Sequence, residues 1–246
     1  MLLVNACSSG TYRAPIVDVG QSAVVSERTT IMLGNGRQHR VNEGESLYAI
    51  AWMYDLDYSA LALANNIQAP YVIFPGQELT LNTQNIPSNT PASNSSNQTQ
   101  TSTVVTSNTS GNAQSRSAGD NNSLLRWVWP AQGNVIATFS SADNENKGLD
   151  IAGNNGDPVL AAESGEVVYA GNGLLRYGEL VIIKHNDQFL SAYAHNNSIN
   201  VSEGDSVRRG QQIANLGSTG IDRNMLHFEI RLSGQPVDPE TYLPPR

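Results

Sequence analysis

The sequence predicts two folded units joined by a disordered polar linker: a small α+β unit over residues 39–82 and a mainly β unit of antiparallel sheets over residues 125–246. Three observations support this fold class. Residues 83–124 are rich in Ser, Thr, Asn and Gln and lack aromatic side chains. The segment before them carries two short amphipathic helical patterns, and the segment after them carries short β-branched or aromatic runs bounded by Gly, Asn and Asp. Residues 1–38 are predicted to be largely disordered.

Composition and charge argue against a nucleic-acid-binding protein and against a membrane-spanning one. At 246 residues the chain can hold one large domain or two small ones, and an apolar content of 39% is low for a single compact unit. The formal net charge of −8 argues against a nucleic-acid partner, because nucleic-acid-binding proteins concentrate positive charge. No stretch approaches the roughly 20 apolar residues that a membrane-spanning helix needs.

Cys7 is the single cysteine of the sequence, which excludes an intrachain disulfide and a cysteine-rich zinc site. It follows the apolar run "MLLVNA" and precedes two serines, a pattern that resembles the end of a bacterial lipoprotein signal. The resemblance implies that Cys7 is acylated and anchors the protein to the outer membrane, facing the periplasm, because Ser8 stands where an Asp is typical of inner-membrane retention. The alternative is a disordered tail with an inert thiol.

The first unit is predicted to run strand, helix, helix, strand. After a short strand, Ser46 is placed as a helix N-cap, and Leu47, Ile50, Ala51 and Tyr54 then lie on one helical face at i, i+3, i+4 and i+7. The run "YSALALANN" gives a second helix that ends at an Asn pair, and "PGQELTLN" gives a closing strand after a Pro-Gly turn.

The ordered motifs GESL, IA, L-x-x-x-NN and PGQ-x-L resemble the LysM domain over nearly the whole first unit. The resemblance implies binding of glycans that contain N-acetylglucosamine, such as the glycan strands of peptidoglycan, in a groove between two loops. The alternative is that Gly44 and Asn66 serve only the geometry of turns. The positions that correspond to the two loops are Gly44, Glu45, Ser46, Asn66, Ile67, Gln68 and Ala69.

The linker cannot bury enough apolar surface to offset its chain entropy, so it is predicted to be disordered. As a flexible coil it spans on the order of 35 Å on average. We therefore expect it to separate two independently folded units.

The second unit contains the strand-like runs "GEVVYAG", "GELVIIKH", "FLSAYAH", "QQIANLG" and "LHFEIRL", which predict an antiparallel sheet with hairpins. Three of the four histidines of the chain, His185, His195 and His227, lie in this unit together with Asp150. Such a set raises the possibility of a zinc hydrolase, which needs three protein ligands and a metal-bound water. The alternative for any lone strand histidine is an ordinary core or surface residue.

The series "NKGLDIA", "GDPVLAAESGEVVYAG", "IIKH", "LSAYAHN" and "LHFEIR" resembles the LytM or lysostaphin-type metallopeptidase domain along its full length. Active members hold zinc through a His, an Asp four residues later, and the second His of a His-x-His pair. By this resemblance the three ligand positions are Asn146, Asp150 and His227. The two catalytic histidines of the family correspond to His195 and Met225.

The resemblance therefore implies that one zinc ligand and one catalytic histidine are absent. The amide of Asn146 is a neutral oxygen donor and a poor substitute for imidazole, so two remaining ligands cannot hold zinc firmly. Met225 can neither transfer a proton nor stabilise an oxyanion. We predict a non-catalytic domain with no metal cofactor.

A lipoprotein-like start, a LysM-like unit, a polar linker and a degenerate LytM-like domain together resemble the family of murein hydrolase activators. The resemblance implies a protein that does not cut peptidoglycan but switches on a periplasmic zinc-dependent N-acetylmuramoyl-L-alanine amidase, which splits septal peptidoglycan during separation of daughter cells. The old groove would engage the amidase and move a helix that blocks its zinc site. Tyr177 is alternatively a plain core aromatic, and Arg176 is placed at the rim. The predicted groove residues are Asn146, Asp150, Tyr177, His195, Met225 and His227.

Two other functions remain open from the sequence. One is a zinc-dependent peptidoglycan endopeptidase with a rearranged ligand set. The other is a passive wall-binding lipoprotein with no catalytic partner.

Overall fold

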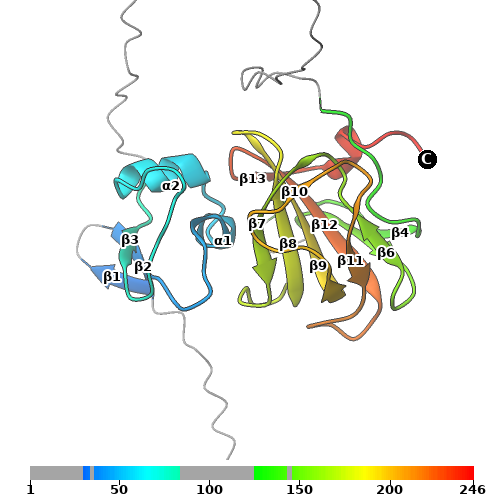
Figure 1. The fold of residues 1–246 in the computed structure, drawn as a ribbon, viewed down its shortest axis with the longest axis horizontal. Helices are drawn as coiled ribbons and strands as arrows, with labels where there is room; N and C mark the ends of the chain where they lie inside the picture. Colours follow the sequence, from blue (N-terminus) through cyan, green and yellow to red (C-terminus); the bar gives the residue numbers. More distant parts are fainter. Residues whose placement is uncertain (1–29, 34–35, 84–124, 143–145) are drawn as a thin grey trace, which may run out of the picture.

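The computed structural model describes residues 30–33, 36–83, 125–142 and 146–246. Two units are visible in Figure 1, which we name the LysM-like unit (the described residues up to 83) and the peptidase-like unit (the described residues from 125). Cys7 and almost all of the predicted linker lie outside the described residues. Within the described part of the chain, no helix has the length and apolarity needed to cross a membrane.

The LysM-like unit is a three-stranded antiparallel sheet in the order β1-β2-β3 with two helices. The predicted strand-helix-helix-strand order is confirmed, and β1 is an addition to it. Strand β1 and the first residues of β2 correct the prediction that residues 1–38 are largely disordered. The short apolar run "TIML" pairs with β2, and no local pattern in the sequence predicts this pairing. The elements are β1 (Thr30–Leu33), β2 (Gly36–Arg40), α1 (Leu47–Met53), α2 (Tyr58–Ala64) and β3 (Glu78–Thr80).

The helix signals act as the sequence predicts. The side chain of Ser46 accepts a hydrogen bond from the amide of Ala49, which caps α1. Three residues of the predicted face, Leu47, Ile50 and Ala51, are buried. The fourth, Tyr54, is half-buried and lies just past the end of α1 as its C-cap. Asp57 caps α2 in the same way, by accepting from the amide of Ala60.

The peptidase-like unit is a ten-stranded sheet in which every pairing is antiparallel, with a main path β10-β7-β8-β9-β12-β5-β4. Strand β11 pairs with both β6 and β9, and β13 pairs with β12. The predicted mainly β fold is confirmed. The strands are β4 (Val135–Ala137), β5 (Leu149–Ala152), β6 (Pro158–Leu160), β7 (Gly165–Gly171), β8 (Glu179–Lys184), β9 (Phe189–Ile199), β10 (Ser206–Val207), β11 (Gln212–Leu216), β12 (Met225–Leu232) and β13 (Gln235–Val237), followed by a 3₁₀ turn at Pro239–Thr241.

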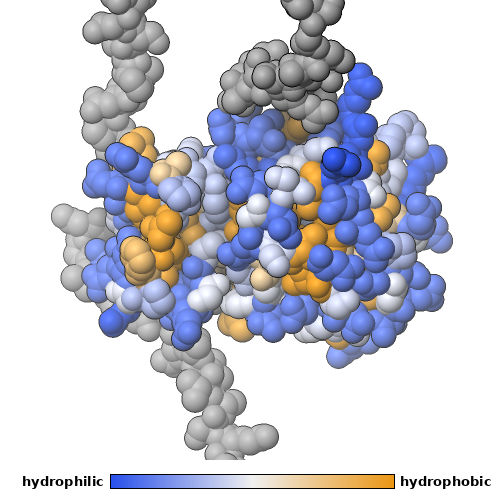
Figure 2. Space-filling model, in the orientation of Figure 1, coloured by the Kyte–Doolittle hydropathy of each residue, from blue (hydrophilic) through white to orange (hydrophobic). Residues whose placement is uncertain are grey.

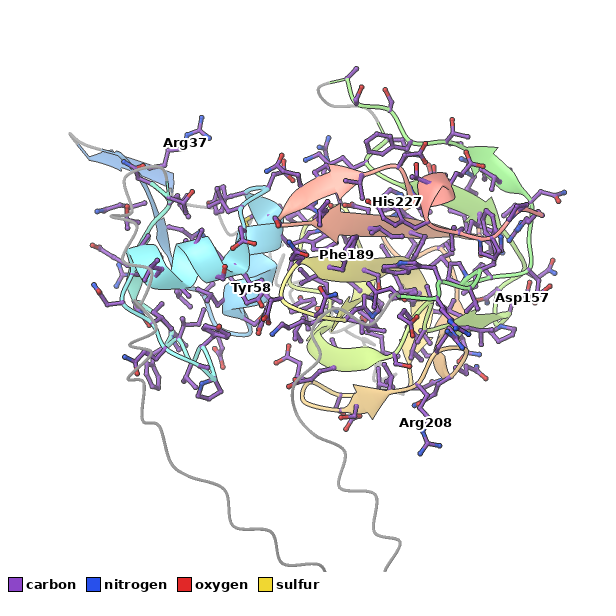
Figure 3. The ribbon with its side chains drawn as sticks, turned by 90° about the horizontal axis from the view of Figure 1, so that it is seen from above. Arg37, Tyr58, Asp157, Phe189, Arg208 and His227 are labelled. Carbon is purple, nitrogen blue, oxygen red and sulfur yellow. The ribbon has the colours of Figure 1, made fainter. Side chains whose placement is uncertain are left out.

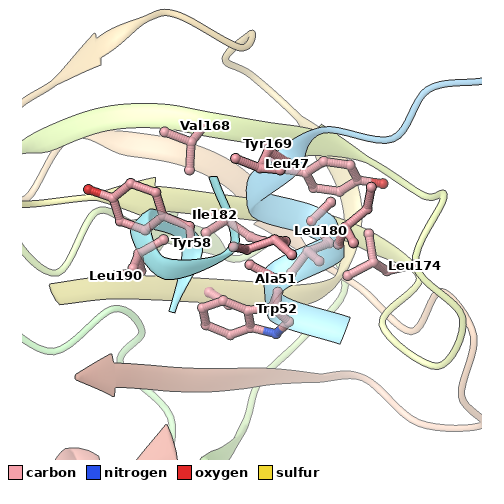
Figure 4. Close-up of a cluster of buried hydrophobic side chains, with 14 of the residues drawn as sticks. Leu47, Ala51, Trp52, Tyr58, Val168, Tyr169, Leu174, Leu180, Ile182 and Leu190 are labelled. Atoms are coloured by element: carbon pink, nitrogen blue, oxygen red, sulfur yellow. The ribbon is translucent and has the colours of Figure 1, made fainter. Parts of the chain in front are cut away.

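The central strands of this sheet are buried on both faces, and alternate residues along β8 join two different cores. Val181 and Ile183 pack in the core of the peptidase-like unit, whereas Leu180 and Ile182 pack in a second core that includes the helices of the LysM-like unit. This alternation follows from the two-residue period of a strand. Figure 4 shows the second core, in which Trp52 of α1 lies beside Ile182 and its neighbours.

This shared core corrects the prediction that the linker separates two independent units. Helices α1 and α2 cover the face of β7, β8 and β9 that the rest of the peptidase-like unit leaves uncovered. The continuous apolar run "LVII" in β8 indicates such packing, because a strand that is apolar on both faces must be covered on both faces.

The LysM-like unit also keeps large apolar side chains on its surface. Leu63, Val72 and Phe74 are 59%, 57% and 66% exposed. Figure 2 shows hydrophobic surface on this unit, at the left of the view, within a largely hydrophilic exterior.

Candidate functional site

The six predicted groove residues lie together around one open cavity of about 440 Å³, which we call the relic groove. Its floor is formed by β5 and β12, which pair so that His227 stands opposite Asp150. One wall is the segment between β7 and β8, which supplies Tyr177 and Arg176. Arg176 is exposed at this wall, where the sequence places it. The groove residues that the sequence predicts are Asn146, Asp150, Tyr177, His195, Met225 and His227.

The imidazole of His227 is held by two carboxylates. Its Nδ1 lies 2.7 Å from Oδ1 of Asp150, and its Nε2 lies 3.2 Å from Oε1 of Glu229. Burial favours the neutral ring, but the hydrogen bonds and charges of the two carboxylates outweigh it and raise the pKa of His227 to about 9. The ring is therefore protonated at neutral pH, and both of its nitrogens donate.

Glu229 and Arg231 continue this network along β12. Residues two apart on a strand point to the same face, so His227, Glu229 and Arg231 form one row. Arg231 Nη2 lies 3.0 Å from Glu229 Oε2, and the hydroxyl of Tyr177 donates to Glu229 Oε1 at 2.8 Å. Burial would raise the pKa of Glu229, but the charge of Arg231 and the bond to His227 lower it to about 2.

Glu229 and Arg231 are not among the predicted groove residues, although their alternation with His227 along one strand was a usable sequence signal. Tyr177 is part of both interpretations that the sequence left open, because it lines the groove and also packs against the core shared by the two units.

His195 lies next to His227, with 6.1 Å between the ring centroids. Its Nδ1 donates to the carbonyl of Thr219 at 2.9 Å, since a carbonyl can only accept. Burial lowers the pKa of His195. The ring is thus neutral and fixed in orientation, with Nε2 as its acceptor.

Asn146 and Met225 stand at the two positions where the family resemblance implies a missing histidine. Oδ1 of Asn146 accepts from the amide of Gly148 at 3.1 Å, which turns it toward the backbone. Met225 is 7% exposed and contributes an apolar side chain to the groove. Within the described ranges, no group of three or more His, Cys, Asp and Glu side chains is arranged to hold a metal ion. The donor set fits zinc poorly, because Asn146 offers a neutral amide oxygen at a position where imidazole would be the better ligand.

The LysM-like unit supplies a second wall that the sequence did not predict. Trp52 and Met53, at the end of α1, line the relic groove. Arg231 Nη1 donates to the carbonyl of Trp52 at 2.8 Å, and its guanidinium stacks 3.8 Å from the centroid of the Trp52 ring. Asp55 also bonds to Arg231, at 2.9 Å, and to Lys147, at 2.5 Å. Figure 3 shows Tyr58 at the junction of the two units and His227 on the peptidase-like side.

Of the predicted glycan-binding positions, Glu45, Ser46 and Ala69 line a second groove between the two units. The carboxylate of Glu45 is already engaged, because Oε2 lies 2.7 Å from Nε2 of the buried His39. The side chain of Glu45 is therefore held in place in the wall of this groove.

The other predicted loop positions serve local structure. Gly44 and Asn66 have positive φ angles of 80° and 55°, which matches the alternative that they set turn geometry. Ile67 packs against the core. The backbone carbonyl of Gln68 accepts a hydrogen bond from the backbone amide of Tyr71 at 2.8 Å. These four positions do not line the groove at which Glu45 lies.

Comparison with known families follows the division into two units. Residues 39–82 match the LysM domain, and residues 144–239 match peptidase family M23. The chain is 42% identical over 268 residues to the "Lipoprotein NlpD/LppB homolog" of Pseudomonas aeruginosa, covering 99% of this chain and 89% of that protein.

Two further relatives have informative names. The "Murein hydrolase activator NlpD" of Escherichia coli K12 is 37% identical, with 86% of this chain and 69% of that protein covered. The "Outer membrane antigenic lipoprotein B" of Haemophilus influenzae is 39% identical, with 85% and 64% covered. The chain belongs to the NlpD/LppB family and combines a LysM domain with a domain of peptidase family M23.

Proposed function

We propose that this protein is a non-catalytic murein hydrolase activator that binds peptidoglycan through its LysM-like unit. Its partner is a periplasmic zinc-dependent N-acetylmuramoyl-L-alanine amidase, and the outcome is the splitting of septal peptidoglycan between daughter cells. The name of the Escherichia coli relative supports the activator role. The names of the relatives as lipoproteins support a place in the cell envelope, with Cys7 as the proposed acylation site.

One observation carries the non-catalytic part of the proposal: the donors of the old metal site are bonded to each other. Asp150 holds His227, and His227 holds Glu229, whose other oxygen binds Arg231. Metal binding would require His227 to lose its proton and to break at least one of these bonds. These contacts, together with the amide of Asn146 at the first ligand position, support a site that does not hold zinc.

The shape of the relic groove supports docking of a helix. Met225 lies in its floor, while Met53 and the 61% exposed Leu175 stand on walls from different units. Methionine and leucine side chains at the edges of a groove suit the apolar face of an amphipathic helix, with packing that adapts to the partner. Engaging a helix that blocks the amidase would shift the amidase toward its open state by differential binding.

The test uses the purified protein, a candidate amidase and dye-labelled peptidoglycan. The protein alone should release no dye and should contain no stoichiometric zinc by elemental analysis. Added to the amidase, it should increase dye release. Dye release by the protein alone, together with one tightly held zinc per chain, would show a working endopeptidase instead.

A further inference from the structure

The second groove, which we call the interunit groove, lies at the N-terminal end of α1, where Leu47 and Tyr48 line it, and has walls from both units. Its volume is about 490 Å³, within the roughly 300–1,000 Å³ typical of small-molecule sites. On one side it is lined by Glu45, Ser46, Leu47, Tyr48 and residues 69–73 of the LysM-like unit. On the other side it is lined by residues 166–168, Lys184, Glu203 and Gly204 of the peptidase-like unit.

Contacts around the interunit groove fix the two walls at one separation. The hydroxyl of Ser46 donates to the carbonyl of Val168 at 3.3 Å. The ammonium of Lys184 lies 5.2 Å from the ring centroid of Tyr58 and 3.1 Å from Oδ1 of Asp187. The ammonium of Lys184 therefore already has partners, and its contact with Tyr58 joins the two units.

A second contact, outside both grooves, locks the same arrangement. Gly234, in the turn between β12 and β13, has φ of 81°, and a Cβ there would overlap the backbone of Leu56 and Asp57 in the LysM-like unit. The side-chain amide of Gln235 donates to the carbonyl of Asp55 at 2.7 Å. This close backbone approach requires glycine.

The two walls differ in chemistry. The LysM-like wall is mainly apolar and aromatic, with the rings of Tyr48 and Tyr71 in an edge-to-face pair at 5.9 Å beside Pro70. The opposite wall presents the carboxylates of Glu166 and Glu203, both of which are exposed residues. A ligand that fits must offer apolar surface to one side and hydrogen-bond donors to the other. Two carboxylates disfavour an anionic ligand.

We propose that an N-acetylated glycan binds in the interunit groove and contacts both units. The LysM-like wall packs against the N-acetyl methyl groups and the apolar faces of the sugar rings. Glu166 and Glu203 accept hydrogen bonds from sugar hydroxyls, and bonds to a charged acceptor are stronger than neutral ones. The inference rests on the proposed glycan binding by the LysM-like unit and adds a second, peptidase-derived wall to that site.

The first experiment measures binding of the β-1,4-linked N-acetylglucosamine tetramer to the full chain by isothermal titration calorimetry. The double variant Glu166→Ala/Glu203→Ala should raise the Kd by about tenfold, the loss expected for charge-assisted hydrogen bonds. The matched control, Asp222→Ala/Glu240→Ala, removes two exposed carboxylates of the same unit outside the groove and should keep the wild-type Kd. Equal affinity of both double variants would contradict the proposal that the peptidase-like unit contributes to glycan binding.

The second experiment tests whether the docked arrangement is needed. Gly234→Ala should force the LysM-like unit away from the opposite wall and raise the Kd by about the same tenfold factor, although residue 234 does not line the groove. Gly210→Ala is the control, because Gly210 has a similar φ of 76° but no atom within 4 Å of its Cβ position. A folded Gly234→Ala protein with wild-type affinity would contradict the proposal.

Glycan binding by the LysM-like unit and the contribution of the second wall are distinguished by different results. If the wild-type chain does not bind the tetramer, both the proposed glycan binding and the proposed second wall are wrong. Wild-type binding that all groove and turn variants retain would leave the LysM-like unit as the glycan site and would remove only the peptidase-derived wall.

Discussion

At the scale of single residues, Arg231 is the side chain on which the junction of the two units depends. It is 1% exposed and contacts Glu229, the carbonyl of Trp52 and Asp55. Breaking a buried ion pair by removing one partner leaves an uncompensated charge. The guanidinium therefore stabilises both the floor of the relic groove and the position of α1.

We predict that Arg231→Met lowers the free energy of unfolding by roughly 3 kcal/mol, because Glu229 is left buried without its main cation. The additional change Glu229→Gln should recover part of this loss. Urea unfolding of the two single variants and the double variant, analysed as a double-mutant cycle, measures the coupling. Additive effects would mean that the pair contributes nothing specific.

We predict that His185, which lines neither groove, makes the stability of the protein depend on pH. Its Nδ1 donates to the carbonyl of Ser164 at 2.9 Å, and its ring lies 4.8 Å from that of Trp127. Burial lowers its pKa from 6.5 to about 4. Because the folded pKa is depressed, the unfolded state binds the proton first, so stability is complete above pH 6.5 and is lost as pH falls toward 4.

The expected contribution of His185 is on the order of 2 kcal/mol across that window, allowing for partial solvent screening. Thermal unfolding at pH 7.5 and at pH 4.5 measures it. His185→Gln cannot titrate, so the variant should lose less stability than the wild type over the same interval. Parallel pH profiles would assign the acid sensitivity to other groups.

At the scale of elements, the capping of α2 is a local and separable contribution. Oδ1 of Asp57 accepts from the amide of Ala60 at 2.8 Å. Asp57→Ala should cost about 1 kcal/mol of stability, whereas Asp57→Asn should retain most of it, because an amide oxygen also caps. Chemical denaturation of both variants tests this. Equal losses would point to the charge of Asp57 rather than to its hydrogen bond.

The elements also show how far the sequence predicts the fold. Both helices, the closing strand of the LysM-like unit and the main strands of the sheet follow from period and turn residues, because these signals are local. Strand β1 and the contact of Gly234 with Leu56 and Asp57 do not, since they depend on partners distant in the chain. The relic positions came from a family resemblance. The row of His227, Glu229 and Arg231 follows from the two-residue period of a strand, but the contacts of Arg231 with Trp52 and Asp55 could not be predicted, because they join segments distant in the chain.

At the scale of the whole molecule, the two units are joined by a shared apolar core. Their shared core includes Trp52 and Tyr58 on one side and Leu180 and Ile182 on the other. We predict a single unfolding transition in calorimetry, because neither side can expose this surface without cost. Gly234→Ala should split the transition into two or broaden it, whereas Gly210→Ala should only shift it. Two separate transitions in the wild type would contradict the shared core.

In the proposed function, the relic groove docks a partner and performs no zinc chemistry of its own. The most direct test of this docking is amidase dye release with folded full-length variants. Asn146→His restores an imidazole at the rim and should leave activation largely intact. Met225→Glu places a carboxylate against the partner and should abolish activation, at a cost of a few kcal/mol of binding free energy.

Leu63→Glu, which adds the same charge at an exposed apolar position away from the relic groove, is the control and should activate normally. Circular dichroism establishes that each variant is folded. We expect activation by Asn146→His and Leu63→Glu and none by Met225→Glu. Full activation by a folded Met225→Glu protein would show that the amidase docks elsewhere.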